Sequence, residues 1–170
     1  MFGKLSVAVG ASVIIMTGLV SQASAGCEIA KGKITNNAQP DGSTLGIVAL
    51  NLGKDKLKCG IVGAPQFPAP PNFKHTVVCD DKAAPGEAQA QVTLNTSFLS
   101  APTFTGFCDE GSPGGPVSFS FEEISTPDPA SARGAFQGIT DEGSITITGD
   151  FNCDGGIVMQ FDGYLCFDDE

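Results

Sequence analysis

The sequence predicts an all-β fold, an antiparallel β-sandwich or barrel-like domain of about 8–10 short strands, stapled by disulfide bonds. Three observations lead to this prediction. Glycine (22 residues) and proline (11 residues), together with Asn, Asp and Ser, interrupt the chain at short intervals. The runs between these interruptions are rich in Val, Ile, Thr and Phe. Six cysteines follow residue 25, and the one helical hint is a single turn at Ala130–Arg133.

Residues 1–25 have the features of a secretory signal peptide. Lys4 gives a positive start, residues 5–20 form an apolar run, and Ala23-Ser24-Ala25 offers a cleavage site of small residues. The run is shorter than the roughly 20 residues that span a bilayer. We therefore expect a cleaved signal peptide and an extracellular or periplasmic protein, whose single mature domain, 26–170, has no integral membrane segment.

The cysteines indicate an oxidising location. An exported chain can close six cysteines as three disulfides. The alternative is a lipid anchor at Cys27, because Ser24-Ala25-Gly26-Cys27 resembles the box that precedes an acylated bacterial cysteine. Acylation would leave an odd number of thiols, so we favour the three disulfides. The expected disulfide cysteines are Cys27, Cys59, Cys79, Cys108, Cys153 and Cys166.

The acidic charge of the chain restricts its partners. The formal net charge is −10. Residues 26–82 hold seven Lys and five acidic residues, whereas residues 83–170 hold Arg133 and fourteen acidic residues. Such a field repels phosphate backbones and anionic lipids, which argues against nucleic acid and membrane surfaces. The expected partner is an unidentified protein or glycan, or a second copy of the chain.

Ten segments have the length and composition of strands. The clearest alternates apolar residues with Gln, Thr, Asn and Ser between 88 and 98, so its polar face, 89–97, is a candidate glycan site. The ten expected strands are 28–35, 44–52, 57–62, 73–79, 89–99, 103–108, 116–124, 134–139, 144–152 and 157–166.

The last two segments predict a hairpin closed by Asp154-Gly155-Gly156. A three-residue loop there places Cys153 opposite Ile157, Phe151 opposite Met159, Gly149 opposite Phe161, Ile147 opposite Gly163 and Ile145 opposite Leu165. In this register Cys153 and Cys166 lie at opposite ends of the hairpin, so we predict that they do not pair. Pairing of Cys59 with Cys79 is a further expectation.

The sequence contains no catalytic signature. His75 is the only histidine, and its period-two spacing with Phe73 and Val77 predicts a packed, inward-facing side chain. No Gly-x-Ser-x-Gly motif surrounds a candidate nucleophile. Adjacent carboxylates on a strand point to opposite faces, so such pairs do not converge on one substrate. These pairs are Asp109-Glu110, Glu122-Glu123 and Asp141-Glu142.

One segment matches the first half of a calcium-binding loop. Asp150, Asn152 and Asp154 supply oxygen ligands at positions 1, 3 and 5, and Gly155 occupies position 6. Position 12, which needs a glutamate, is a phenylalanine, and Asp162 follows one residue later. The hypothesis is a weak calcium site of Asp150, Asn152, Asp154 and Asp162, and the competing interpretation is a plain Asp-Gly turn. No other cofactor is expected.

Our leading functional hypothesis is a non-enzymatic structural or adhesive protein that acts at the cell surface or after secretion. The first alternative is a module that binds a small ligand, a glycan or calcium at the polar face 89–97 or the loop 150–154. The second is a secreted hydrolase that uses His75 or a carboxylate pair.

Overall fold

The computed structural model describes residues 26–66, 72–80 and 90–168. The expected signal peptide, residues 1–25, lies outside the described residues, as do Ala88 and Gln89 of the predicted polar strand. The described chain forms nine strands and one 3₁₀ helix. They are β1 (Gly26–Ala38), β2 (Thr44–Leu52), β3 (Asp55–Pro65), β4 (Phe73–Cys79), β5 (Ala90–Phe98), β6 (Thr103–Phe107), β7 (Val117–Arg133), η1 (Gly134–Phe136), β8 (Ser144–Phe151) and β9 (Gly156–Phe167).

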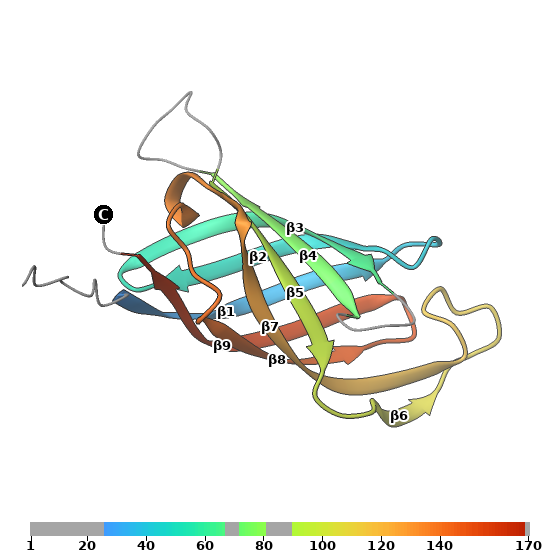
Figure 1. Cartoon of the computed structure of the whole chain (residues 1–170). Helices are drawn as coiled ribbons and strands as arrows, with labels where there is room; N and C mark the ends of the chain where they lie inside the picture. Colours follow the sequence, from blue (N-terminus) through green and yellow to red (C-terminus); the bar gives the residue numbers. More distant parts are fainter. Residues whose placement is uncertain (1–25, 67–71, 81–89, 169–170) are drawn as a thin grey trace, which may run out of the picture.

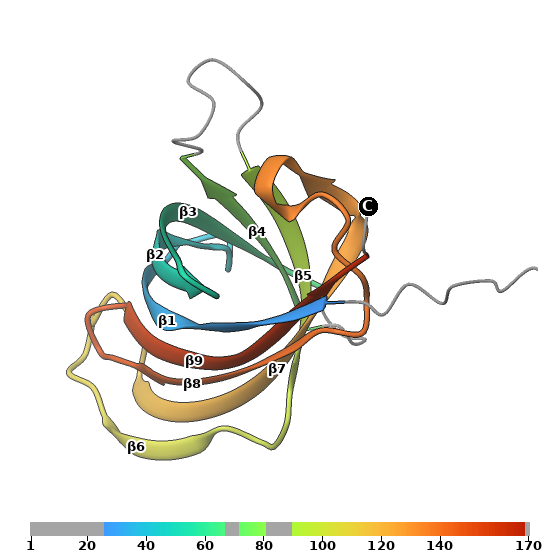
Figure 2. The ribbon, with the colours of Figure 1, turned by 90° about the vertical axis from the view of Figure 1, so that its left-hand side faces the viewer.

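Eight of the strands close into an antiparallel barrel (Figure 1). The hydrogen-bonded order is β5-β4-β3-β2-β1-β9-β8-β7, and β7 pairs back with β5. The predicted all-β fold is thereby confirmed, and of its two alternatives the chain adopts the barrel. Figure 2 shows these eight strands curving around one interior. A barrel of this strand number has just enough interior for packed side chains or one small ligand.

The ninth strand, β6, lies outside the barrel and continues the path of β5. Both β5 and β6 pair antiparallel with β7, β5 with its Glu123–Arg133 part and β6 with its Val117–Ser120 part. Residues 99–102 separate the two. β6 is therefore the end of a long hairpin that extends past one mouth of the barrel, where Figure 1 shows it opposite η1.

Period-two alternation determines which side chains fill the barrel. In β2, for example, Val48, Leu50 and Leu52 are buried, whereas the intervening residues are more exposed. The same pattern in the other strands gives one continuous apolar cluster. The barrel core is therefore built from every second residue of each strand.

The segment that follows β7 corrects the predicted strand 134–139. Residues 134–139 do not form a strand, because Gly134 (φ 59°) and Gly138 (φ 80°) adopt conformations that turn the chain. The helical hint at Ala130–Arg133 lies in the end of β7, and the 3₁₀ turn follows it. This turn folds over the barrel end and buries Phe136 completely (0% exposed).

β7 extends to Arg133, nine residues beyond the end of the predicted strand 116–124, and it includes Pro127 and Pro129. The pairing of β7 with β8 ends at Ser125, so beyond that residue β7 has a sheet neighbour only on the β5 side. Proline lacks an N–H group and is tolerated where one side of a strand is unpaired. Pro127 and Pro129 therefore do not end this strand.

The β8–β9 hairpin forms as predicted, but its predicted register is wrong. The three-residue loop is Cys153-Asp154-Gly155, one residue earlier than expected, with Gly155 at φ 80° and the Asn152 N–H donating to the Gly156 carbonyl (2.9 Å). The observed pairs are Phe151 with Ile157, Gly149 with Met159, Ile147 with Phe161 and Ile145 with Gly163. The pairing moves by two residues, so every side chain keeps the face that was predicted for it.

All six cysteines form disulfides, as predicted. The pairs are Cys27–Cys166, Cys59–Cys79 and Cys108–Cys153. The predicted pairing of Cys59 with Cys79 is confirmed, and Cys153 and Cys166 are not partners. Three disulfides fit an extracellular or other oxidising location.

Candidate functional site

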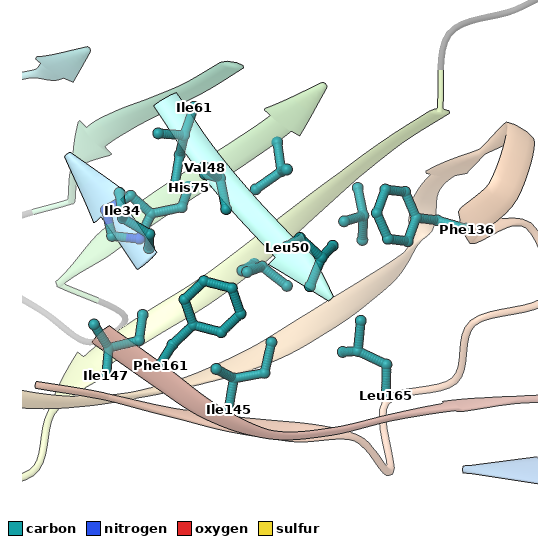
Figure 3. A pocket seen from close by; sticks show the side chains of 13 residues that line it. Ile34, Val48, Leu50, Ile61, His75, Phe136, Ile145, Ile147, Phe161 and Leu165 are labelled. Atoms are coloured by element: carbon teal, nitrogen blue, oxygen red, sulfur yellow. The ribbon is translucent and has the colours of Figure 1, made fainter. Parts of the chain in front are cut away.

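The two ends of the barrel interior are filled differently. Toward the end covered by η1, a cavity of about 40 Å³ is lined by aliphatic side chains together with Phe136, Phe161 and His75. Figure 3 shows Phe136 and Leu165 on one side of this cavity and Ile34, Ile147 and His75 on the other. A space of this size holds little more than a water molecule. This end is therefore packed core.

The opposite end contains a larger, open cavity of about 260 Å³, which we call the aromatic pocket. Its lining residues come mostly from strand ends and the β1–β2 connection at this mouth. They are Asn36, Ala38, Gly42, Thr44, Phe73, His75, Phe98, Phe119, Phe121, Glu123, Phe151, Ile157 and Met159. For comparison, an engineered apolar cavity of about 150 Å³ binds benzene.

Aromatic rings form a continuous wall along one side of the pocket. The Phe73 ring is stacked on His75 (centroids 5.6 Å apart) and meets Phe98 edge-on at 6.3 Å. The wall continues from Phe98 to Phe121 at 6.3 Å and from Phe121 to Phe119 at 6.1 Å. It ends where Phe119 stacks on Phe151 at 4.9 Å. Strands β4, β5, β7 and β8 thus contribute to one apolar surface.

Glycines create the space for this arrangement. A Cβ on Gly149 would lie 2.6 Å from Phe121 and 2.5 Å from Met159, so only glycine lets both side chains reach the pocket. A Cβ on Gly63 would lie 2.4 Å from the Thr44 hydroxyl and 2.7 Å from the His75 ring. The absence of side chains at these two positions therefore shapes the wall and the polar floor.

His75, at the floor of the pocket, begins a short hydrogen-bonded chain that continues into the core. His75 Nδ1 lies 2.9 Å from the Thr96 hydroxyl, which lies 2.7 Å from the Ser125 hydroxyl. His75 is buried, as predicted, and burial lowers its pKa to about 4. The imidazole is therefore neutral at pH 7, and its ring is held in place by Thr96.

A second polar pair lies on the opposite wall. Asn36 Nδ2 donates to the Thr44 hydroxyl (3.3 Å). Asn36 Oδ1 packs over Gly46, where a Cβ would lie 2.0 Å from it. Within the described part of the chain, this oxygen is the only enclosed side-chain polar atom without a hydrogen bond.

Glu123 is the acidic group of the pocket. It follows Phe119 and Phe121 on the inner face of β7, with Phe98 opposite on β5 and Ile147 opposite on β8. The residue is only 3% exposed, and its carboxyl forms no hydrogen bond or ion pair with the described residues. Burial raises its pKa to about 7. The neighbouring Glu122 is exposed on the outer face, so this carboxylate pair does not converge, as predicted.

The predicted glycan and calcium residues lie outside the pocket, whereas His75 and Glu123, two candidates of the hydrolase alternative, line it. Gln91, Thr93, Asn95 and Ser97 face outward from β5, and the neighbouring Thr96 points inward as part of the chain that His75 begins. Outside the pocket, the calcium candidates Asp150, Asn152 and Asp154 are exposed around the β8–β9 turn, and Asp154 Oδ1 accepts from the Gly156 N–H (2.8 Å).

Asp162 is separated from the other calcium candidates. It pairs with Thr146, whereas Asp150 pairs with Val158, four residues away along β9, which corresponds to about 13 Å of strand. Across residues 26–66, 72–80 and 90–168, no group of three or more His, Cys, Asp or Glu is arranged to hold a metal ion. The calcium site stays a prediction, as does the expectation that the protein is not an enzyme.

Sequence reasoning did not identify the aromatic pocket, although part of its signal was present. Phe119, Phe121, Glu123 and Ser125 alternate along one strand, so an acidic and a polar residue occupy the same face as two phenylalanines. This mixture on one face is unusual for a packed core.

The class of this protein follows from its structure alone. The fold and site define the class as a disulfide-bonded, closed antiparallel β-barrel with an open, aromatic-lined end. No protein-family model, no curated protein and no solved structure matches the chain. Among the described residues, no helix has the length and apolar character needed to cross a membrane.

Proposed function

We propose that the protein is an exported binding protein that holds a small, largely apolar ligand in the aromatic pocket. The observation that carries this proposal is an open cavity of about 260 Å³ with aromatic walls and a few polar groups at its floor. Ligand sites of proteins have this composition, and the mouths of β-barrels are a common location for them. This is the small-ligand alternative of the sequence analysis, at a different site.

Export is part of the proposal and rests on the predicted signal peptide together with the three disulfides. The sulfur of Cys27 is bonded to Cys166, and it is the atom that a lipid anchor would modify. This supports a protein without an acylated Cys27.

Indole is a suitable first probe, because its flat apolar ring matches the wall. The chain contains no tryptophan, so indole fluorescence can be excited selectively. We expect a saturable change in emission with a dissociation constant on the order of 0.1 mM, in the range of ligand efficiencies for small ligands. The absence of saturable binding would contradict the proposal.

A matched pair of variants locates the binding site. Ala38 lines the pocket and the adjacent Asn37 is exposed on the outside of β1. We expect Ala38→Phe to weaken indole binding about tenfold or more by filling the cavity, and Asn37→Phe to leave it unchanged. Equal effects of the two substitutions would place the bound indole outside the pocket.

One specific observation supports the structural or adhesive hypothesis. β6 is an edge strand of the sheet. Its Phe104 (54% exposed) and Phe107 (85% exposed) lie on the surface with their ring centroids 4.9 Å apart. Edge strands with apolar side chains favour pairing with another copy. This second function predicts a concentration-dependent size that Phe107→Ser abolishes, and a constant monomer in sedimentation would contradict it.

A further inference from the structure

We infer that the ligand of the aromatic pocket is a small amine that binds as its ammonium ion, with its nitrogen at the carboxylate of Glu123 and its apolar body against the phenylalanine wall. This inference rests on the proposed function and specifies the chemistry of the ligand.

The first step is that Glu123 is accessible from the cavity although it is buried in the barrel. Its side chain lines the pocket and is 3% exposed. Asn36 Oδ1 is the only unpaired side-chain polar atom in the described chain that is sealed from solvent. The carboxyl oxygens of Glu123 also lack a hydrogen-bond partner there, so they must border the open space of the pocket.

The second step is that the described residues supply no cation to this carboxylate. On the neighbouring strands, the inward-facing residues nearest to Glu123 are Thr96 and Phe98 on β5 and Ile145, Ile147 and Gly149 on β8. The described residues that line the pocket include no Lys or Arg, and their one other titratable residue, His75, is neutral at pH 7. A buried carboxylate without a partner is costly, so the positive charge that would stabilise it has to come with the ligand.

The third step is that the walls suit a cation as well as an apolar group. Phe98 lies opposite Glu123 on β5, Phe121 lies two residues before it on β7, and both line the pocket with it. The face of an aromatic ring attracts an ammonium ion, and a carboxylate adds a charge-assisted hydrogen bond. The two together distinguish an amine from a neutral aromatic molecule and from an anion.

Tryptamine and indole test this inference, because they share the ring and differ in the ammonium group. At pH 8 we expect wild-type protein to bind tryptamine about tenfold or more tightly than indole. Glu123→Gln should remove this preference, so that tryptamine binds no more tightly than indole. Glu122→Gln, the neighbouring carboxylate on the outer face, is the matched control and should preserve the preference.

The pH dependence of wild-type binding provides a measurement that needs no variant. Tryptamine stays protonated below pH 9, because its amine resembles that of lysine, with a pKa of about 10.4. The Glu123 carboxyl has a pKa of about 7, so it takes up a proton as the pH falls below 7. We therefore expect tryptamine affinity to fall between pH 8 and pH 5 until it matches that of indole, about tenfold or more in total, and indole affinity to stay constant.

The outcomes separate the two proposals. Equal binding of tryptamine and indole at pH 8 would overturn the amine inference and leave the pocket as an apolar binding site. Loss of binding of both ligands in Glu123→Gln would also overturn it, since the carboxyl would then maintain the structure of the pocket and would not recognise the ammonium group. Failure of both probes to bind wild-type protein would overturn the proposed function as well.

Discussion

The closed and open ends of the barrel are built by the same alternation of residues, but different side chains fill them and leave cavities of different size. The closed end packs aliphatic side chains under Phe136 and leaves a cavity of about 40 Å³. The open end has a wall of phenylalanines along one side of a cavity of about 260 Å³ and buries a carboxyl group without a partner among the described residues. A chain selected for stability alone would fill this space and replace the carboxyl group. The difference between the ends is therefore the main argument for a binding site.

The disulfides also differ between strands and loops. Cys27 lies directly opposite Cys166 across β1 and β9, and Cys59 lies opposite Cys79 across β3 and β4, so both bonds join strands that are already paired. Cys108–Cys153 instead joins the connection after β6 to the β8–β9 turn. There the Gly114 N–H also donates to the Cys153 carbonyl (2.9 Å). The bond at the open end thus fixes loops at the mouth, where the strand ladder does not hold them.

The largest expected effect comes from emptying the closed end. Phe136 is fully buried, whereas Phe119 in the pocket wall is only partly buried. We expect Phe136→Ala to lower the free energy of unfolding by about 4 kcal/mol and Phe119→Ala by about 1–2 kcal/mol. Urea denaturation of the oxidised protein measures both. Equal losses would mean that the open end is packed as tightly as the closed end.

Local patterns predicted the strands well. The expected strands 44–52 and 73–79 match β2 and β4 residue for residue, because turn residues and alternation mark both ends. Hairpin geometry predicted that Cys153 and Cys166 do not pair. The two-residue error in the β8–β9 register did not affect this result, because both registers place these cysteines far apart.

Long-range geometry was the part that the sequence did not reveal. Closure of the barrel depends on pairing β5 with β7 across residues 99–116, and no local signal marks this contact. The pocket depends on which end η1 covers, since phenylalanines on an inner face have the same pattern whether they line a cavity or fill it. Residues 134–139 have strand composition, and the left-handed glycines that turn them over the barrel end overrode it.

The smaller expected effect concerns the cost of keeping Glu123 in the pocket. Its pKa rises from an ordinary value of 4.5 to about 7 in the folded protein, so folding favours the protonated form. Stability from this group is fully present below about pH 4.5 and is lost as the pH rises toward 7. Since glutamine resembles the protonated form, Glu123→Gln should raise the free energy of unfolding by up to roughly 3 kcal/mol at pH 8 and by little at pH 4.5.

Urea denaturation at several pH values measures this difference, and Glu122→Gln is again the control. The effect of His75, whose pKa of about 4 makes it destabilising only at acid pH, is common to all three proteins and cancels in the differences. If Glu123→Gln were no more stable than wild type at pH 8, the carboxyl would have a partner or be well solvated, and the contrast between the two ends would lose its electrostatic part. If it is more stable and has also lost the preference for tryptamine, the same carboxyl group weakens the fold and selects the ligand.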